Sequence, residues 1–135
     1  MERENLKVLI GCETSGTVRD AFYWAGFDAW SCDILSADTP TNRHLVGDVR
    51  EVIHWDDWDL LYIGHPPCTR LCNSGVRWLH KAPPSRTLES LWSELDDGCS
   101  LFREMMDADI PNIAIENPVM HKHAKSRIWG PDWKK

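Results

Sequence analysis

A cysteine and a glutamate, each directly after a short apolar segment, are the residues of this chain best suited to chemistry. Cys68 closes the sequence Gly-His-Pro-Pro-Cys, which follows the apolar residues 60–63. Glu116 opens the sequence Glu-Asn-Pro after the apolar residues 112–115. If the two segments are neighbouring parallel strands, their carboxyl ends bring a thiol and a carboxylate to one crevice, where open parallel sheets bind ligands. A thiol nucleophile beside a carboxylate that handles protons can attack an electron-poor ring.

The surroundings of Cys68 favour a reactive thiol. Two prolines precede it, and they restrict the backbone and remove two amide donors. Positive charge stabilises a thiolate, and His65, Arg70 and Arg77 are close in sequence. The alternative is a buried structural thiol, which is the commonest role of a free cysteine. We expect that structural role for three other thiols, Cys12, Cys32 and Cys99.

Glu116 ends an apolar strand, where a carboxylate is costly unless it is hydrogen-bonded or belongs to a site. Asn117 and Pro118 restrict the turn after it. We predict a functional role for Glu116 and Asn117. The alternative for Glu116 is a carboxylate that only caps the end of the strand.

A metal site is a competing interpretation of the same two loops. Their soft ligands are His65, Cys68, Cys72, His80, His121 and His123. Zinc sites prefer tighter paired spacings than His-x-x-Cys-x-x-x-Cys followed by His-x-His. We therefore predict no metal ligands among the site residues.

Small and acidic residues follow the first three predicted strands, where a nucleoside cofactor would bind. Glu13, Ser15 and Gly16 follow the first strand, and a glycine there lets backbone amides approach a ligand at a helix N-terminus. Asp33 ends the second strand and can accept hydrogen bonds from ribose hydroxyls. Asp48 follows the third strand and can accept from an exocyclic amine. Each signal also fits an ordinary turn or cap, so their order along the chain carries the prediction.

Apolar runs and turn residues predict the elements that position these side chains. Strands are expected at 6–11, 27–32, 44–46, 60–63 and 110–115. Helices are expected at 17–25 and 88–108, with a helical turn at 49–53 and a long loop at 65–87. Thr14 and Ser15 are candidate caps of the first helix, and Gly26 is its candidate stop. Strands that alternate with helices predict a right-handed α/β fold with a mostly parallel sheet of about five strands and flanking helices.

Composition sets outer limits on the function. The 135 residues suffice for one domain, predicted at 1–135. The net charge of −6 argues against a protein that holds phosphate backbones by bulk electrostatics alone. Five cysteines without a Cys-x-x-Cys pair favour reduced thiols and a cytoplasmic location, and no apolar run approaches membrane-spanning length. The eight tryptophans exceed the needs of one small core, and some are expected in a groove or a subunit contact.

The ordered residues resemble the catalytic half of the cytosine-C5 DNA methyltransferases, most of all short phage- and prophage-type proteins. Gly-His-Pro-Pro-Cys is similar to that family's Pro-Cys nucleophile loop, and Ile-Ala-Ile-Glu-Asn-Pro is similar to its Glu-Asn motif. The similarity spans residues 8–119. It implies a Rossmann-like S-adenosylmethionine-dependent methyltransferase fold, truncated at the C-terminus, because the family's later arginine motif and target-recognition domain have no counterpart here. Thr69 stands where the family usually has glutamine.

The resemblance also implies a reaction. S-adenosylmethionine would be the cofactor and cytosine in DNA the substrate, flipped out of the helix so that its ring can be reached. Cys68 would add to C6 of the ring, Glu116 would hold the ring-nitrogen edge, and Asn117 would position the Cys68 loop. The residues that match the cofactor site are Glu13, Ser15, Gly16, Asp33, Asp48 and Pro66.

A second hypothesis keeps the scaffold but not the turnover. The chain would then be a catalytically incomplete phage-type protein that binds a nucleotide or S-adenosylmethionine, or a subunit that needs a partner to complete the site. The unmatched C-terminal motifs and the excess of tryptophan motivate it. A five-stranded sheet has edges to cover, so a homo-oligomer or a second subunit is expected.

Overall fold

The computed structural model describes residues 2–64, 87–116, 124 and 128. These residues fall into two compact units, which are described separately. The first contains residues 2–64 and 106–116, and the second contains residues 87–105 with Ala124 and Ile128.

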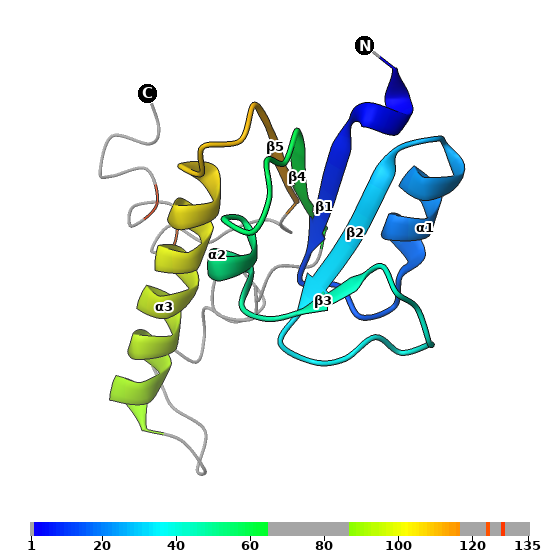
Figure 1. Ribbon diagram of the computed structural model, residues 1–135. Coiled ribbons are helices and arrows are strands. Elements are labelled where there is room, and N and C mark those ends of the chain that lie inside the picture. The colour runs from blue at the N-terminus through cyan, green and yellow to red at the C-terminus, as the bar shows by residue number, and fades with distance from the viewer. Residues whose placement is uncertain (1, 65–86, 117–123, 125–127, 129–135) are drawn as a thin grey trace. The chain divides into compact units, whose positions relative to one another are not determined.

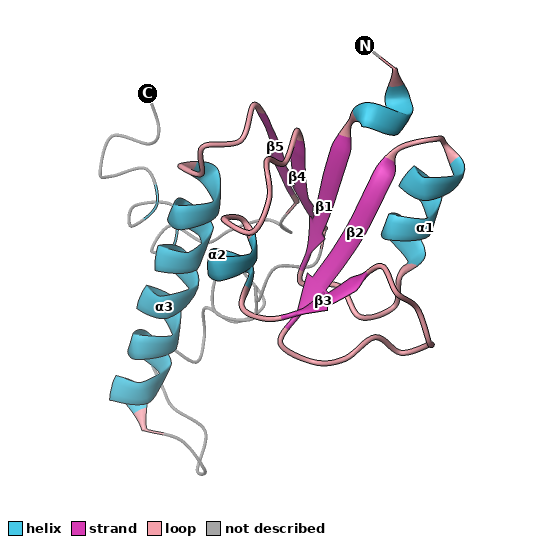
Figure 2. Ribbon diagram, viewed as in Figure 1, coloured by secondary structure: helices cyan, strands magenta, loops and turns pink. Residues whose placement is uncertain are grey.

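The first unit is built on a five-stranded sheet with the order β3-β2-β1-β4-β5 (Figures 1 and 2). All of its neighbouring strands pair in parallel. The strands are β1 (Lys7–Gly11), β2 (Asp28–Asp33), β3 (His44–Val46), β4 (Leu60–Ile63) and β5 (Asn112–Ile115). With flanking helices on a parallel sheet of this order, the unit has an α/β fold of Rossmann-like topology, which confirms the predicted fold class at this level.

The register brings the ends of all five strands to one edge of the sheet, called the carboxyl edge below. Gly11 pairs with Cys32, Asp33 pairs with Val46, and Ile63 pairs with Ile115. Because β1 is central, the loops that follow β2 and β3 lie on one side of it, and those that follow β4 and β5 lie on the other. The prediction that the strands before Gly64 and Glu116 are parallel neighbours is thereby confirmed.

Helix α1 (Thr17–Trp24) covers one face of the sheet. The core on this side consists of Val8, Ile10 and Ala29, with partly buried side chains from α1 and β4 packed against them. Two of those, Phe22 and Tyr62, have ring centroids 6.2 Å apart. The helix ends where predicted, because Gly26 adopts a φ of +101° that reverses the chain.

The short helix α2 (Val49–Val52) lies on the opposite face (Figure 1). A β-carbon at Gly11 would lie 3.0 Å from side-chain carbons of both Val49 and Ile63, so this glycine permits close packing of α2 on the sheet. The indole of Trp58 donates to the carbonyl of Val52 at 3.0 Å. Leu9 and Leu61 are fully buried at the sheet centre.

The second unit contains helix α3 (Leu88–Met106, of which 88–105 belong to this unit). Its buried side chains recur at helical spacing and are Leu91, Leu95, Cys99, Phe102 and Met105. At its start, Thr87 Oγ1 accepts a hydrogen bond from the amide of Ser90 at 3.1 Å, as an N-cap does. The Cys99 thiol donates to the carbonyl of Ala124 at 3.8 Å. No helix in the described part of the chain is long and apolar enough to cross a bilayer.

The predicted strands and helices differ from the observed ones at their ends, and the structure adds a short 3-10 helix, η1 (Arg3–Asn5), that was not predicted. Helix α3 stops two residues before the predicted end, because a turn at Ala108 accepts the amide of Ile110. Strand β5 begins at Asn112 and not at Ile110, since Pro111 has no N–H for the ladder. The predicted loop at 65–87 lies, except for residue 87, outside the described residues.

Candidate functional site

The loops at the carboxyl edge are tied to one another by backbone hydrogen bonds beyond the last strand pairs. The amide of Glu13 donates to the carbonyl of Cys32 at 3.1 Å, and that of Gly47 donates to Asp33 at 2.8 Å. On the other side of β1, the amide of Glu116 donates to the carbonyl of Ile63 at 2.8 Å. The first residues of these loops therefore have fixed positions at the carboxyl edge.

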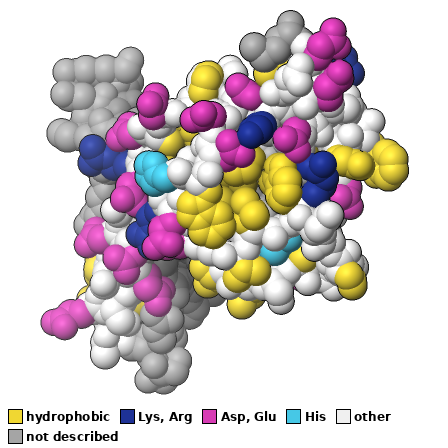
Figure 3. Space-filling view, in the orientation of Figure 1, with side chains coloured by type: hydrophobic (Ala, Val, Ile, Leu, Met, Phe, Trp, Pro, Cys, Tyr) yellow, Lys and Arg dark blue, Asp and Glu magenta, His cyan; other side chains and the backbone are white. Residues whose placement is uncertain are grey.

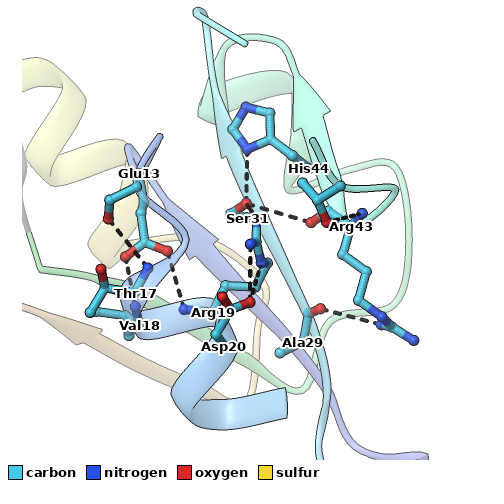
Figure 4. Close-up of polar contacts among 11 residues, drawn as sticks. Glu13, Thr17, Val18, Arg19, Asp20, Ala29, Ser31, Arg43 and His44 are labelled. Carbon is cyan, nitrogen blue, oxygen red and sulfur yellow. Dashed lines mark hydrogen bonds and ion pairs between the residues drawn. The ribbon is translucent and has the colours of Figure 1, made fainter. Parts of the chain in front are cut away.

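Glu13 is directed into the protein and not toward solvent (Figure 4). Its side chain is 4% exposed. Its two carboxylate oxygens accept the amides of Val18 at 3.0 Å and Arg19 at 3.1 Å. A carboxylate at this position neutralises the positive end of the helix dipole. Glu13 thus caps α1 from three residues before the Gly16 N-cap, a role that we had predicted for Thr14 and Ser15.

Ser15 and Gly16 complete the turn into α1. The hydroxyl of Ser15 accepts the amide of Thr17 at 3.3 Å, and Gly16 adopts a φ of +78°. The amides of the first three helical residues are therefore all bonded within the loop. Phosphate groups bind helix N-termini through such amides. A buried carboxylate beside these amides would repel an anion from the same place.

Cys12 precedes Glu13 and is the non-glycine residue with positive φ in the described chain, at +58°. Burial, with Asp33 and Asp48 nearby, raises the pKa of its thiol to about 11. Burial also raises the pKa of Cys32 to about 12. Both thiols are therefore protonated at neutral pH and are poor nucleophiles. This agrees with the structural role predicted for them.

Asp33 lies at the end of β2 and holds the turn that follows. Its Oδ1 accepts the amide of Leu35 at 2.9 Å. The side chains of Ile34 and Leu35 are 71% and 65% exposed. Exposed aliphatic side chains beside a carboxylate offer an apolar surface and a hydrogen-bond acceptor at the same margin of the site.

Asp48 is occupied by a neighbour. Its carboxylate accepts the amide of Arg50 at 2.9 Å and pairs with the Arg50 guanidinium, whose Nη2 lies 2.8 Å from Oδ2. These hydrogen bonds from Arg50 lower the pKa of Asp48 below its usual range. Asp48 thus caps α2, and any ligand that uses its carboxylate must share it with Arg50.

Glu116 lies on the other side of β1 and has a partner that the sequence did not suggest. The hydroxyl of Tyr62 donates to Glu116 Oε2 at 3.3 Å. Burial, then Glu116 and Glu13, raise the pKa of Tyr62 above its ordinary value. The only indication of this contact in the sequence is a tyrosine in an otherwise aliphatic strand.

The remaining predicted residues, Cys68, Asn117 and Pro66, lie outside the described residues. The same is true of the residues of the competing metal interpretation, His65, Cys68, Cys72, His80, His121 and His123. Among the residues that the structure does describe, no group of three or more His, Cys, Asp or Glu side chains is arranged to hold a metal ion.

Arg19 is a further residue that sequence reasoning missed. Its side chain is 4% exposed, and its guanidinium pairs with Asp20 at 3.0 Å. A β-carbon at Gly16 would lie 2.3 Å from Arg19 Nη2, so the guanidinium lies directly against the Gly16 turn. An arginine in a short amphipathic helix is normally exposed, and no pattern in the sequence distinguishes this one.

The edge therefore combines carboxylates on both sides of the central strand with an apolar margin at Ile34 and Leu35. Comparisons with protein-family models, with curated proteins and with solved structures found no match for this chain.

Proposed function

We propose that this chain is an S-adenosylmethionine-dependent methyltransferase domain that transfers a methyl group to C5 of cytosine in DNA. One observation carries the proposal: the carboxyl edge of a β3-β2-β1-β4-β5 sheet is acidic, and the helix that begins at its centre has no free N-terminal amides. A Rossmann-like edge is a place where nucleoside cofactors bind. The charge of the edge and the hydrogen bonds already made there decide which nucleoside cofactor it favours.

The charge pattern favours a cationic cofactor over a phosphorylated one. Dinucleotides place their pyrophosphate on the first helix N-terminus, where Glu13 here accepts the Val18 and Arg19 amides. S-adenosylmethionine has no phosphate and carries a positive sulfonium and an ammonium group. Carboxylates such as Asp33 and Glu116 attract these groups, and within the described residues neither forms an ion pair.

The side of the edge formed by β2 and β3 suits the adenosine. The Oδ1 of Asp33 is bonded to Leu35, which leaves Oδ2 for the ribose hydroxyls. The exposed side chain of Ile34 offers an apolar contact for the adenine. Asp48 lies one strand further and lends an acceptor that it shares with Arg50. Ser15 and Gly16 face the same margin from the central loop, and Glu13 contributes by holding that loop.

The side formed by β4 and β5 suits the chemistry. The amide of Glu116 is bonded to the carbonyl of Ile63, which precedes Gly64, so Glu116 lies beside the start of the segment that leads to Cys68. Cys68 follows Gly64 by four positions in the sequence. The proposal assigns the Cys68 thiolate and the Glu116 carboxylate to the same cytosine ring. Pro66 and Asn117 belong to the two segments that would close over it.

In the proposed reaction the bound cofactor supplies an electrophilic methyl group. The Cys68 thiolate forms a bond to C6 of the flipped-out cytosine while Glu116 holds the ring-nitrogen edge. The electron-rich C5 would then bond to the methyl carbon while the bond from that carbon to the sulfonium sulfur breaks, so that S-adenosylhomocysteine would leave. A base then removes the proton from C5, and the bond between Cys68 and C6 breaks, which restores the thiolate and the aromatic ring.

Transfer of labelled methyl from S-adenosylmethionine to cytosine-containing DNA tests the proposal. We expect transfer by the wild type, loss of at least a hundredfold in Cys68→Ala, and little change in Cys72→Ala as the matched control. Activity that survives Cys68→Ala would refute the mechanism. Binding of S-adenosylmethionine without any transfer would instead support the second hypothesis, a binding protein or a subunit completed by a partner chain. The net charge of −6 is the observation that favours this alternative.

A further inference from the structure

A chain of hydrogen bonds runs in the first unit from Arg19 of α1 through Ser31 to His44 (Figure 4), and from His44 on to the loop after β2. Arg19 Nη1 donates to Ser31 Oγ at 2.9 Å. Ser31 Oγ lies 2.8 Å from His44 Nδ1, and His44 Nε2 lies 2.9 Å from the carbonyl oxygen of Leu35. Ser31 is fully buried and Arg19 is 4% exposed. These three side chains and the Leu35 carbonyl form one polar path, which connects α1, β2, β3 and the loop after β2.

Chemistry gives this path a single direction. The Leu35 carbonyl can only accept, so His44 Nε2 must carry the hydrogen. In the neutral imidazole Nδ1 is then an acceptor for the Ser31 hydroxyl at 2.8 Å, which is closer than the other acceptor of that hydroxyl, the carbonyl of Arg43 at 3.5 Å. The Ser31 oxygen in turn accepts from Arg19, a guanidinium that can only donate. Each of the three hydrogen bonds along the path thus joins one donor to one acceptor.

The path ends on the peptide that carries the apolar margin of the site. The carbonyl of Leu35 is held by His44 and its amide by Asp33 Oδ1 at 2.9 Å. Ile34 stands between Asp33 and this fixed peptide, with its side chain exposed. Further along the same loop, the amide of Asp38 donates to the carbonyl of Thr14 at 2.9 Å. The loop after β2 is thus attached both to the central loop and, through His44, to the interior.

The other end of the path lies against the central loop. Arg19 fills the space beside Gly16, and its own amide is bonded to Glu13. The same arginine therefore contacts the turn that contains Ser15 and Gly16. The two loops that would enclose an adenosine are connected by one polar path, which is buried at Arg19 and Ser31 and half-buried at His44.

We propose that His44 is a positioning residue, which sets the affinity of the site for the adenosine part of its cofactor by holding the Leu35 peptide. This inference rests on the proposed function, since it concerns the same site. His44 does not touch the cofactor in this scheme. It orients Ile34 and the free oxygen of Asp33, and the Arg19–Ser31 pair orients His44.

Two substitutions at His44 distinguish a role of its hydrogen bond to Leu35 from a role of its side-chain volume alone. In His44→Gln the side-chain amide nitrogen reaches the place of Nε2 and can still donate to Leu35. In His44→Asn the shorter amide reaches only the place of Nδ1, so the contact with Ser31 remains and that with Leu35 is lost. His54→Asn is the matched control, because His54 is an exposed histidine outside the path.

The experiment is calorimetric titration of each full-length variant with S-adenosylmethionine, with adenosine and with methionine, accompanied by amide hydrogen exchange. We expect His44→Asn to lower the affinity for S-adenosylmethionine and for adenosine about five- to tenfold, because one ordering hydrogen bond is lost. The affinity for methionine should not change. Exchange at the Leu35 amide should rise in parallel. His44→Gln and His54→Asn should stay within about twofold of the wild type.

Two failures are distinguishable. If the wild type binds neither S-adenosylmethionine nor adenosine, the proposed function is wrong and this inference falls with it. If the wild type binds both and His44→Asn binds them equally well, only the inference is overturned. Equal losses in His44→Asn and His44→Gln, or an equal loss for methionine, would also overturn it, because they would indicate a general disturbance of the fold.

Discussion

The hydroxyl of Tyr62 donates a hydrogen bond to Glu116 and thereby joins the side chains of two adjacent strands at the carboxyl edge, with 3.3 Å between the oxygens. Tyr62 lies next to the end of β4, and Glu116 follows the end of β5. The contact orients the carboxylate to which we assign the cytosine ring. It also places a titratable phenol where it can report on that carboxylate.

Replacement of Glu116 by glutamine should lower the pKa of Tyr62. Burial raises this pKa first, and the charge of Glu116 and its hydrogen bond with the hydroxyl raise it further. Removal of the charge leaves the burial, so the pKa should fall toward 10 without reaching it. Tyrosinate absorbance as a function of pH measures the change, with Tyr62→Phe to subtract the signal of Tyr23. An unchanged titration in Glu116→Gln would contradict the contact.

Alkaline pH should destabilise the fold through two buried thiols. The pKa of Cys12 is raised to about 11 and that of Cys32 to about 12, against 9.0 for an ordinary thiol. Since the folded values are the higher ones, the contribution of the neutral thiols to stability is complete below pH 9 and is lost as the pH rises toward 11 to 12. Urea unfolding at several pH values should show a free energy of unfolding that falls above pH 9. Cys32→Ala should be less stable overall but should show a smaller fall, and equal slopes in the two proteins would refute the assignment.

Alanine at Gly16 should cost more stability than alanine at Gly26. Both glycines have positive φ, +78° and +101°, so either substitution strains the backbone by roughly 1–2 kcal/mol. At Gly26 the nearest atom to the new β-carbon is 3.7 Å away, whereas at Gly16 it would be 2.3 Å from the guanidinium of Arg19. Chemical denaturation should therefore show about 1 kcal/mol or more of additional loss for Gly16→Ala, because the buried guanidinium of Arg19 has to move. A smaller loss at Gly16 than at Gly26 would mean that Arg19 does not lie against the turn.

Removal of the Glu13 carboxylate should give α1 some affinity for anions. In Glu13→Ala the amides of Val18 and Arg19 lose their acceptor, which should destabilise the protein by about 1–2 kcal/mol. The same amides become available to sulfate. Thermal unfolding should therefore show a larger stabilisation by sulfate in Glu13→Ala than in the wild type, with chloride at equal ionic strength as the control. Equal responses of the two proteins would remove the argument that Glu13 excludes phosphate.

Local patterns were sufficient to locate the elements. The apolar runs before Cys12, at 44–46 and before Gly64 are strands, and the 3.6-residue spacing in 88–106 is a helix, because burial of one face requires these periods. The alternation of the two also determined that the sheet is parallel, since a crossover helix returns the chain in the same direction. From this it followed that Asp33, Asp48 and Glu116 lie at one edge. The ends of the elements could not be predicted as well, because each depends on a single hydrogen bond. Pro111 cannot donate one to the sheet, and the turn at Ala108 is closed by one from Ile110.

Only the tertiary structure decided what the polar side chains at that edge do. Glu13 was predicted beside a cofactor, and it is buried under α1; Asp48 was predicted as a ligand acceptor, and it holds Arg50. The partners of Tyr62 and Ser31 are 54 and 13 positions away in sequence. A hydrogen bond is satisfied by whichever group the packed strands bring within about 3 Å, and that choice depends on strand order and register. Sequence periodicity determines which face of an element is buried, but it carries no information about the groups that meet across two elements.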